Sequence, residues 1–139
     1  MAHEGMMLFT AEYSDLSAAL ADLATIEQLH DDELVGKYDA AVIDKENGRP
    51  HIVKRVDRPR MRVIPEAFGF GTLRRKELHE AAQELTAGAA GLIVIGEPTI
   101  EKGLDKAVDS ATKVAKRTVD ATSEEIADEL KHAFSGAES

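Results

Sequence analysis

The chain has no cysteine, no tryptophan and few aromatic residues of any kind. Without cysteine it can form no disulfide bond, thiolate metal site or cysteine nucleophile. Aromatic residues make up only 4% of the 139 residues, so the core must consist mostly of small aliphatic side chains. Such a core buries less area per residue than an aromatic one, which makes self-association a natural supplement to stability.

Long apolar runs are missing too. No stretch approaches the roughly 18 apolar residues that a membrane-spanning helix needs, and the opening residues 1–5 do not look like a secretion signal. We therefore expect a soluble, cytoplasmic protein with no membrane span. The net charge of −9 disfavours nucleic acid as a partner, because the phosphate backbone would repel the chain.

What the sequence does contain is typical of one globular domain. Hydrophobic residues make up 43% and charged residues 31% of the chain, a globular rather than a disordered balance. The length suffices to bury a core without metal or disulfide support. We predict a single domain over residues 1–139, with a frayed tail at residues 135–139.

The first half of the chain predicts a strand, a helix and a hairpin. The apolar run at residues 6–13 predicts a central strand, and Ser14 is placed to cap a helix that reaches residue 34. Residues 38–44 and 50–56 predict the next two strands. Between them lies Asn47-Gly48, the strongest short signal for a hairpin turn.

The second half predicts further helices and strands. A second helix is expected over residues 73–85, followed by a buried strand at 90–97. Pro98 opens a third helix whose apolar face extends to Val114 or Ala115. A short strand at residues 118–121 and a final helix, which starts with the capping box at 122–125, complete the chain.

This order predicts an α+β fold of the ferredoxin-like βαββαβ type, a sandwich with an additional C-terminal helix, short strand and final helix. Right-handed crossovers would place both early helices on one face of an antiparallel sheet. The other face would then be covered by the third helix, the final helix or a second subunit.

Three stretches carry a resemblance to a known family. They are YDAAVIDKENGRPHIV at residues 38–53, LTAGAAGLIVIGEPTIEKGLDKAV at 85–108 and KRTVDATSEEIADELKHAF at 116–134. Together they resemble, in order, a bacterial family of unknown function that is often labelled predicted membrane proteins. The resemblance implies a ferredoxin-like core and brings no catalytic residues.

The chain departs from this family at one place. Such proteins usually carry a Gly-rich membrane hairpin after the third strand, where this chain has the short, charged stretch VDRPRMRVIPEAFGFGTLRR at residues 56–75. The resemblance therefore implies a soluble variant that lacks the membrane hairpin.

The most unusual feature of the sequence is a basic stretch in an acidic chain. Residues 54–62 hold five basic residues and one acidic residue; the basic ones are Lys54, Arg55, Arg58, Arg60 and Arg62. Guanidinium groups suit carboxylates and phosphates, so this stretch predicts an anion site or a surface for an acidic protein partner. The alternative, which we favour, is that these charges pair with acidic helices of the same protein or of a second subunit.

A glycine-rich stretch follows at residues 67–75, with Phe68 and Phe70 between the glycines and Arg74 and Arg75 after them. Glycines before a helix can hold a phosphate on backbone N–H groups. The stretch lacks the lysine of a P-loop and the full dinucleotide-binding pattern. Phenylalanines in such a loop more often pack into the core or against a partner.

Metal and cofactor sites are not indicated. The stretch HEAAQ at residues 79–83 has Gln83 where a zinc protease needs its second histidine. The five histidines are dispersed without ligand spacing. We therefore predict no metal, no cofactor and no catalytic residue.

Two functions remain open. The first is a non-enzymatic binding or assembly module that self-associates through its sheet or through the loop from Arg55 to Arg75. The alternative is a domain that binds, or acts on, a small anionic metabolite, with Tyr13, Tyr38, His51 and the arginine cluster as candidates. RNA binding is the least favoured, because stacking aromatics on the strands are few.

Overall fold

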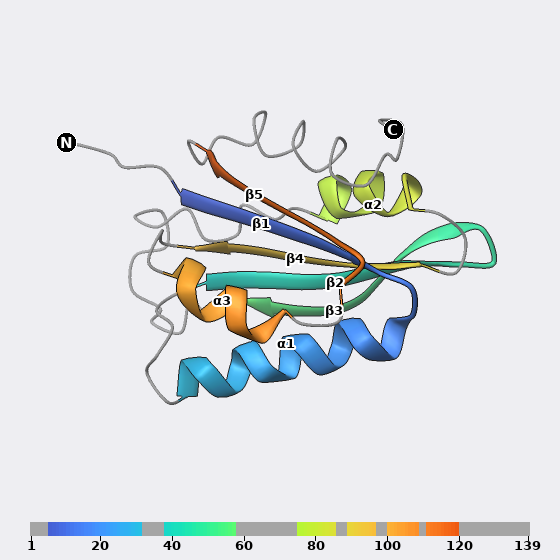
Figure 1. The fold of residues 1–139 in the computed structure, drawn as a ribbon. Helices are drawn as coiled ribbons and strands as arrows, with labels where there is room; N and C mark the ends of the chain where they lie inside the picture. Colours follow the sequence, from blue (N-terminus) through green and yellow to red (C-terminus); the bar gives the residue numbers. More distant parts are fainter. Residues whose placement is uncertain are drawn as a thin grey trace.

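The described residues of the computed structural model form five strands and three helices (Figure 1). The strands are β1 (Met6–Tyr13), β2 (Tyr38–Glu46), β3 (Arg49–Asp57), β4 (Ala90–Gly96) and β5 (Lys113–Val119). The helices are α1 (Leu16–Asp31), α2 (Arg75–Gln83) and α3 (Glu101–Ala107). The structure describes residues 6–31, 38–57, 75–85, 89–96, 100–108 and 111–119.

The strands form one antiparallel sheet in the order β3-β2-β4-β1-β5. The strand β4 lies in the middle and is buried along its whole length. Its uninterrupted apolar sequence is what a strand covered on both faces requires. The predictions of a buried strand here and of a central strand at residues 6–13 are therefore confirmed.

The β2–β3 hairpin forms where the sequence predicted it. Asn47 and Gly48 make the turn, with φ angles of 58° and 78°. Two positive φ angles match the twist of the flanking strands, which is why Asn-Gly is favoured here. Further along, Val42 pairs with Lys54 while Ile43 pairs with Ile52, so Val53 is an extra residue in β3. This irregularity is a β-bulge.

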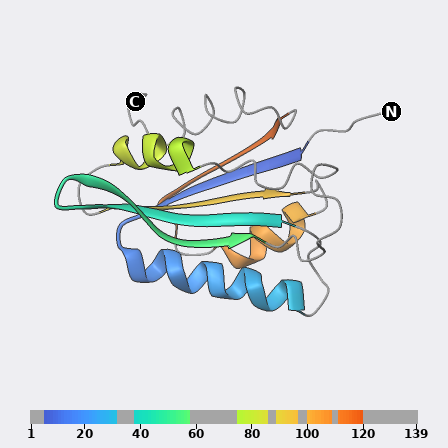
Figure 2. The same ribbon diagram turned by 180° about the vertical axis from the view of Figure 1, so that it is seen from behind.

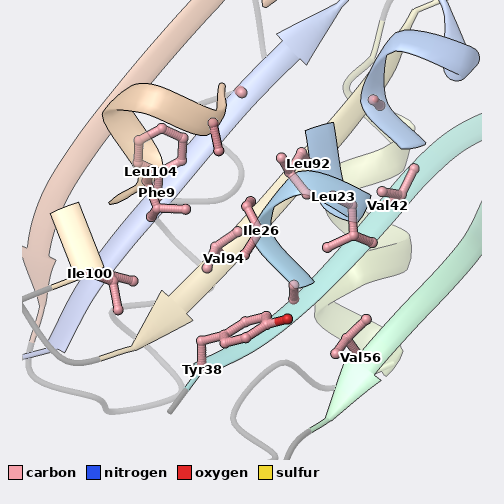
Figure 3. Close-up of a cluster of buried hydrophobic side chains, with 14 of the residues drawn as sticks. Phe9, Leu23, Ile26, Tyr38, Val42, Val56, Leu92, Val94, Ile100 and Leu104 are labelled. Atoms are coloured by element: carbon pink, nitrogen blue, oxygen red, sulfur yellow. The ribbon is translucent and has the colours of Figure 1, made fainter. Parts of the chain in front are cut away.

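One face of the sheet is covered by α1 and α3. The helix α1 is capped by Asp15, whose Oδ1 accepts the Ala18 N–H at 2.9 Å, one residue later than the predicted cap. Apolar side chains of both helices pack against alternate residues of the strands (Figure 3). Those labelled in the figure are Phe9, Leu23, Ile26, Tyr38, Val42, Val56, Leu92, Val94, Ile100 and Leu104.

The opposite face is covered by α2 (Figure 2). Leu78, Ala81 and Ala82 pack there against the strand residues that point away from α1. The core is thus divided by the sheet into two layers. Both layers are mainly aliphatic, as the composition predicted.

The ferredoxin-like arrangement of the sheet is not the one observed. In that plan the third strand lies between the first two, whereas here β4 lies there and β3 is at the edge. The connections β1–α1–β2 and β3–α2–β4 each join two parallel strands that have one strand between them in the sheet. The first connection runs from β1 toward β3, and the second runs from β3 toward β5. Connections of the same hand would put α1 and α2 on one face, as predicted. They lie on opposite faces, so the two crossovers have opposite hands.

The prediction for residues 98–115 is wrong in its second half. The helix α3 ends at Ala107, and Val108 has an extended backbone while its N–H still donates to the Leu104 carbonyl. Residues 113–119 form the strand β5 instead of continuing the helix. An exposed strand lacks the apolar alternation that marks a half-buried one, so helical spacing was the stronger signal. The predicted final helix lies outside the described residues.

The turn allows a direct test. A Cβ at Gly48 would meet no atom within 4 Å, so a side chain there is opposed only by the positive φ. We expect Gly48→Val to lower the free energy of unfolding by about 1–2 kcal/mol, because a β-branched residue disfavours this conformation. Gly48→Asn is the control, since asparagine tolerates positive φ. Equal urea midpoints for the two variants would contradict a left-handed turn.

Candidate functional site

The residues predicted to bind an anion are only partly described. Arg55 lies exposed in β3, and Arg75 is the first residue of α2. The remaining candidates, Arg58, Arg60, Arg62, Phe68, Phe70 and Arg74, lie outside the described residues. Lys54 approaches Glu27 of α1 at 3.6 Å, so one cation of this stretch does pair with an acidic helix of its own chain. The anion site stays a prediction.

The three side chains proposed for the alternative function do not converge. Tyr13 is paired in register with Ala90 at one end of β4, and Tyr38 with Gly96 at the other. Both tyrosine side chains are buried. They therefore belong to the packing between the sheet and α1, and they do not form a site together with His51.

His51 lies near the hairpin turn beside two carboxylates. Its Nδ1 is 2.9 Å from Asp44 Oδ1 and 3.6 Å from Glu46 Oε1. Asp44 and His51 are cross-strand partners, and the His51 side chain is 45% exposed. A pair this exposed contributes less than about 1 kcal/mol. Within the described ranges, no three histidine, aspartate or glutamate side chains are placed to hold a metal ion.

A hollow of about 580 Å³ adjoins His51. It is lined by Glu46, Asn47, Arg49, Pro50 and His51, all from the turn end of one hairpin. Ligand sites usually enclose most of a ligand between several elements. This hollow therefore does not identify a ligand.

A buried polar pair stands inside the aliphatic core. The Tyr13 hydroxyl donates to Asp22 Oδ2 at 2.8 Å, and Asp22 is only 6% exposed. Burial of the ring, the hydrogen bond and the Asp22 charge all raise the pKa of Tyr13 above its ordinary value. The pair joins the end of β1 to α1, and its role is to fix that contact.

The strand β5 presents the most accessible part of the sheet. It lies at the end of the strand order, so no described strand pairs with its outer side. Residues 113–116 are exposed although they point alternately to the two faces of the sheet. Val114, at 44% exposure, is the one large hydrophobic side chain exposed among the described residues. We call residues 113–116 the β5 edge.

The β5 edge is held in place by its neighbours. The Thr112 N–H and hydroxyl both donate to the Glu12 carbonyl, at 2.8 and 3.0 Å. Lys116 Nζ lies 3.0 Å from Asp105 Oδ1 of α3. From Lys113 to Val119 the strand pairs with β1 in unbroken register. The edge is therefore a regular strand with its backbone in position for a further strand.

The other edge of the sheet differs. The strand β3 contains Pro50, which has no N–H to donate, and the bulge at Val53. Proline, bulges and charged residues are devices by which edge strands avoid pairing with other chains. Charged residues occur in both edge strands, but a proline and a bulge interrupt only β3. Of these two edges, β5 is the better suited to contact a partner.

Charge is segregated between parts of the described chain. The strand β5 contains three basic residues and no acidic one, in a chain of net charge −9. By contrast, residues 6–31 contain five acidic residues and neither lysine nor arginine. The β5 edge was not predicted from the sequence, because apolar residues at helical spacing extend the predicted third helix over residues 113–115. The signal present was this basic run in an acidic chain.

No family model, curated protein or solved structure matches this chain. The resemblance noted in the sequence therefore stays a prediction. Among the described residues, no helix is long and apolar enough to cross a membrane.

The Tyr13–Asp22 pair predicts how stability depends on pH. Because the pKa of Tyr13 is raised by folding, its contribution is complete below pH 10, where the unfolded tyrosine is also protonated. Above pH 10 only the unfolded state loses the proton, so this contribution falls by up to about 1.4 kcal/mol per pH unit.

Tyr13→Phe removes this dependence. At pH 8 we expect the variant to be less stable by about 1–3 kcal/mol, because the buried Asp22 loses the hydrogen bond from the Tyr13 hydroxyl. The difference in free energy of unfolding between the native chain and the variant, measured by urea titration, should become smaller between pH 10 and 11. A difference that does not change with pH would show that folding does not raise the pKa of Tyr13.

Proposed function

We propose that this chain is a non-enzymatic binding and assembly module that self-associates, and that the β5 edge is its contact surface. From the sequence alone we further propose a cytoplasmic protein, and from its resemblance a bacterial member of the family described above that lacks the membrane hairpin. The observation that carries the function is the contrast between the two edges of the sheet. The strand β3 is interrupted, whereas β5 is regular and its residues 113–116 are exposed on both faces.

The exposure of Val114 supports this choice of surface. Single exposed hydrophobic residues are common, but this one stands on an edge strand between Lys113 and Lys116. A contact there would remove its apolar surface from water. At about 25 cal/mol per Å², that gain is small for one valine, so most of the affinity has to come from backbone pairing and charge.

The segregation of charge supports assembly between copies. Two β5 edges repel each other, because every charged residue in them is basic. A β5 edge and exposed acidic residues of a second copy, such as Asp15, attract each other instead. Self-association is therefore expected to join unlike surfaces, and to weaken as salt screens the attraction.

Light scattering coupled to size-exclusion chromatography tests this function. At about 0.05 M salt we expect a dimer or larger assembly, and at about 1 M salt a monomer, since the Debye length falls to about 3 Å. Lys113→Glu should give a monomer at both salt concentrations.

Arg49→Glu is the matched control, because it makes the same charge change at an exposed position of the other edge strand. This variant should assemble like the native chain. A native monomer at both salt concentrations, or an assembly that Lys113→Glu leaves intact, would refute the proposal.

A further inference from the structure

We propose that the β5 edge also takes an extended acidic segment of another protein, which adds to the sheet as a new strand beside β5. This inference rests on the proposed function of the β5 edge, and it names the chemistry of the partner. Strand addition gives affinity through main-chain hydrogen bonds and specificity through alternate side chains.

The backbone geometry suits strand addition. The β5 edge contains no proline and keeps an unbroken register with β1. It directly follows Thr112, which is fixed by two hydrogen bonds to the Glu12 carbonyl. The β5 backbone is therefore already ordered, and only the added strand would lose conformational entropy on binding. Residues 113–116 are exposed on both faces, so side chains of the added strand have room on either side.

The charge of the edge selects an acidic partner. Every charged residue of β5 is basic, and like charges directly opposite each other destabilise paired strands. Lys113 is already paired in register with Glu12 of β1 on one side. A basic segment would place a like charge on its other side, whereas an acidic segment would place a second carboxylate there. Such attraction acts mainly on partner choice and on the rate of encounter.

The order of side chains along β5 defines a pattern in the partner. Acidic residues are favoured opposite Lys113 and Lys116, and an apolar residue is favoured opposite Val114. Ala115 leaves its opposite position open. In antiparallel pairing, the added segment therefore contains, from its N-terminal end, an acidic residue opposite Lys116, any residue, an apolar residue, and an acidic residue opposite Lys113. Lys116 already contacts Asp105, so Lys113 is the better position for a test.

Fluorescence anisotropy with synthetic peptides tests the inference on the full chain. The acidic probe is Thr-Asp-Asp-Ser-Val-Asp-Thr, and the neutral probe replaces each aspartate by asparagine. A third probe is the acidic peptide N-methylated at alternate residues, which keeps its charge and removes strand pairing. We expect the acidic probe to bind at least about tenfold more tightly than either of the others at low salt.

Two variants locate the binding. Lys113→Glu should weaken binding of the acidic probe by about tenfold or more, while Arg49→Glu should leave it unchanged. Circular dichroism confirms that both variants are folded. Equal binding of the methylated probe would show attraction without strand addition, and equal binding by Lys113→Glu would place the contact elsewhere. Either result overturns the inference.

The remaining outcomes separate the inference from the proposed function. If the neutral probe binds as tightly as the acidic one, the β5 edge is a contact surface but does not select acidic partners. If no probe binds while the chain still assembles in a Lys113-dependent way, the inference alone fails. If no probe binds and the chain is monomeric at low salt, both fail.

Discussion

The burial of β4 on both faces is the constraint on which the other elements depend. Every residue of this strand is buried, so apolar layers are needed above and below it and paired strands on both sides. The strands β1 and β2 supply the pairing, α1 and α3 supply one layer, and α2 supplies the other. A helix layer on one face only, as in a ferredoxin-like sandwich, would leave Ile93 and Ile95 facing water.

Because the centre of the sheet is buried, its charged side chains lie mainly on the two edge strands. Each edge strand makes an ion pair with the same helical layer: Lys54 with Glu27 of α1, and Lys116 with Asp105 of α3. These pairs account for part of the basic charge of both edges without any ligand. What distinguishes the edges is the backbone, because Pro50 and the bulge at Val53 interrupt β3 and nothing comparable interrupts β5.

Local signals predicted local structure well. The Asn47-Gly48 turn, the apolar runs of β1 and β4 and the start of α1 to within one residue follow from propensities that act over a few residues. The order of the strands did not follow, because choosing β4 rather than β3 as the neighbour of β1 depends on which apolar strand needs both faces covered. The β5 edge was missed since an exposed basic strand has no apolar period, and Val114 and Ala115 continued the spacing of the preceding helix.

The strand order also has a consequence for the way the chain folds. Among the five described strands, only β2 and β3 are neighbours both in the sequence and in the sheet. The strand β1 pairs with β4 and β5, so it finds no partner until residues 90–119 are present. Such non-local pairing slows folding, because a long loop must close before any contact compensates for the lost entropy. During synthesis, the hairpin can therefore form early, while the N-terminal strand has to wait for the C-terminal third of the chain.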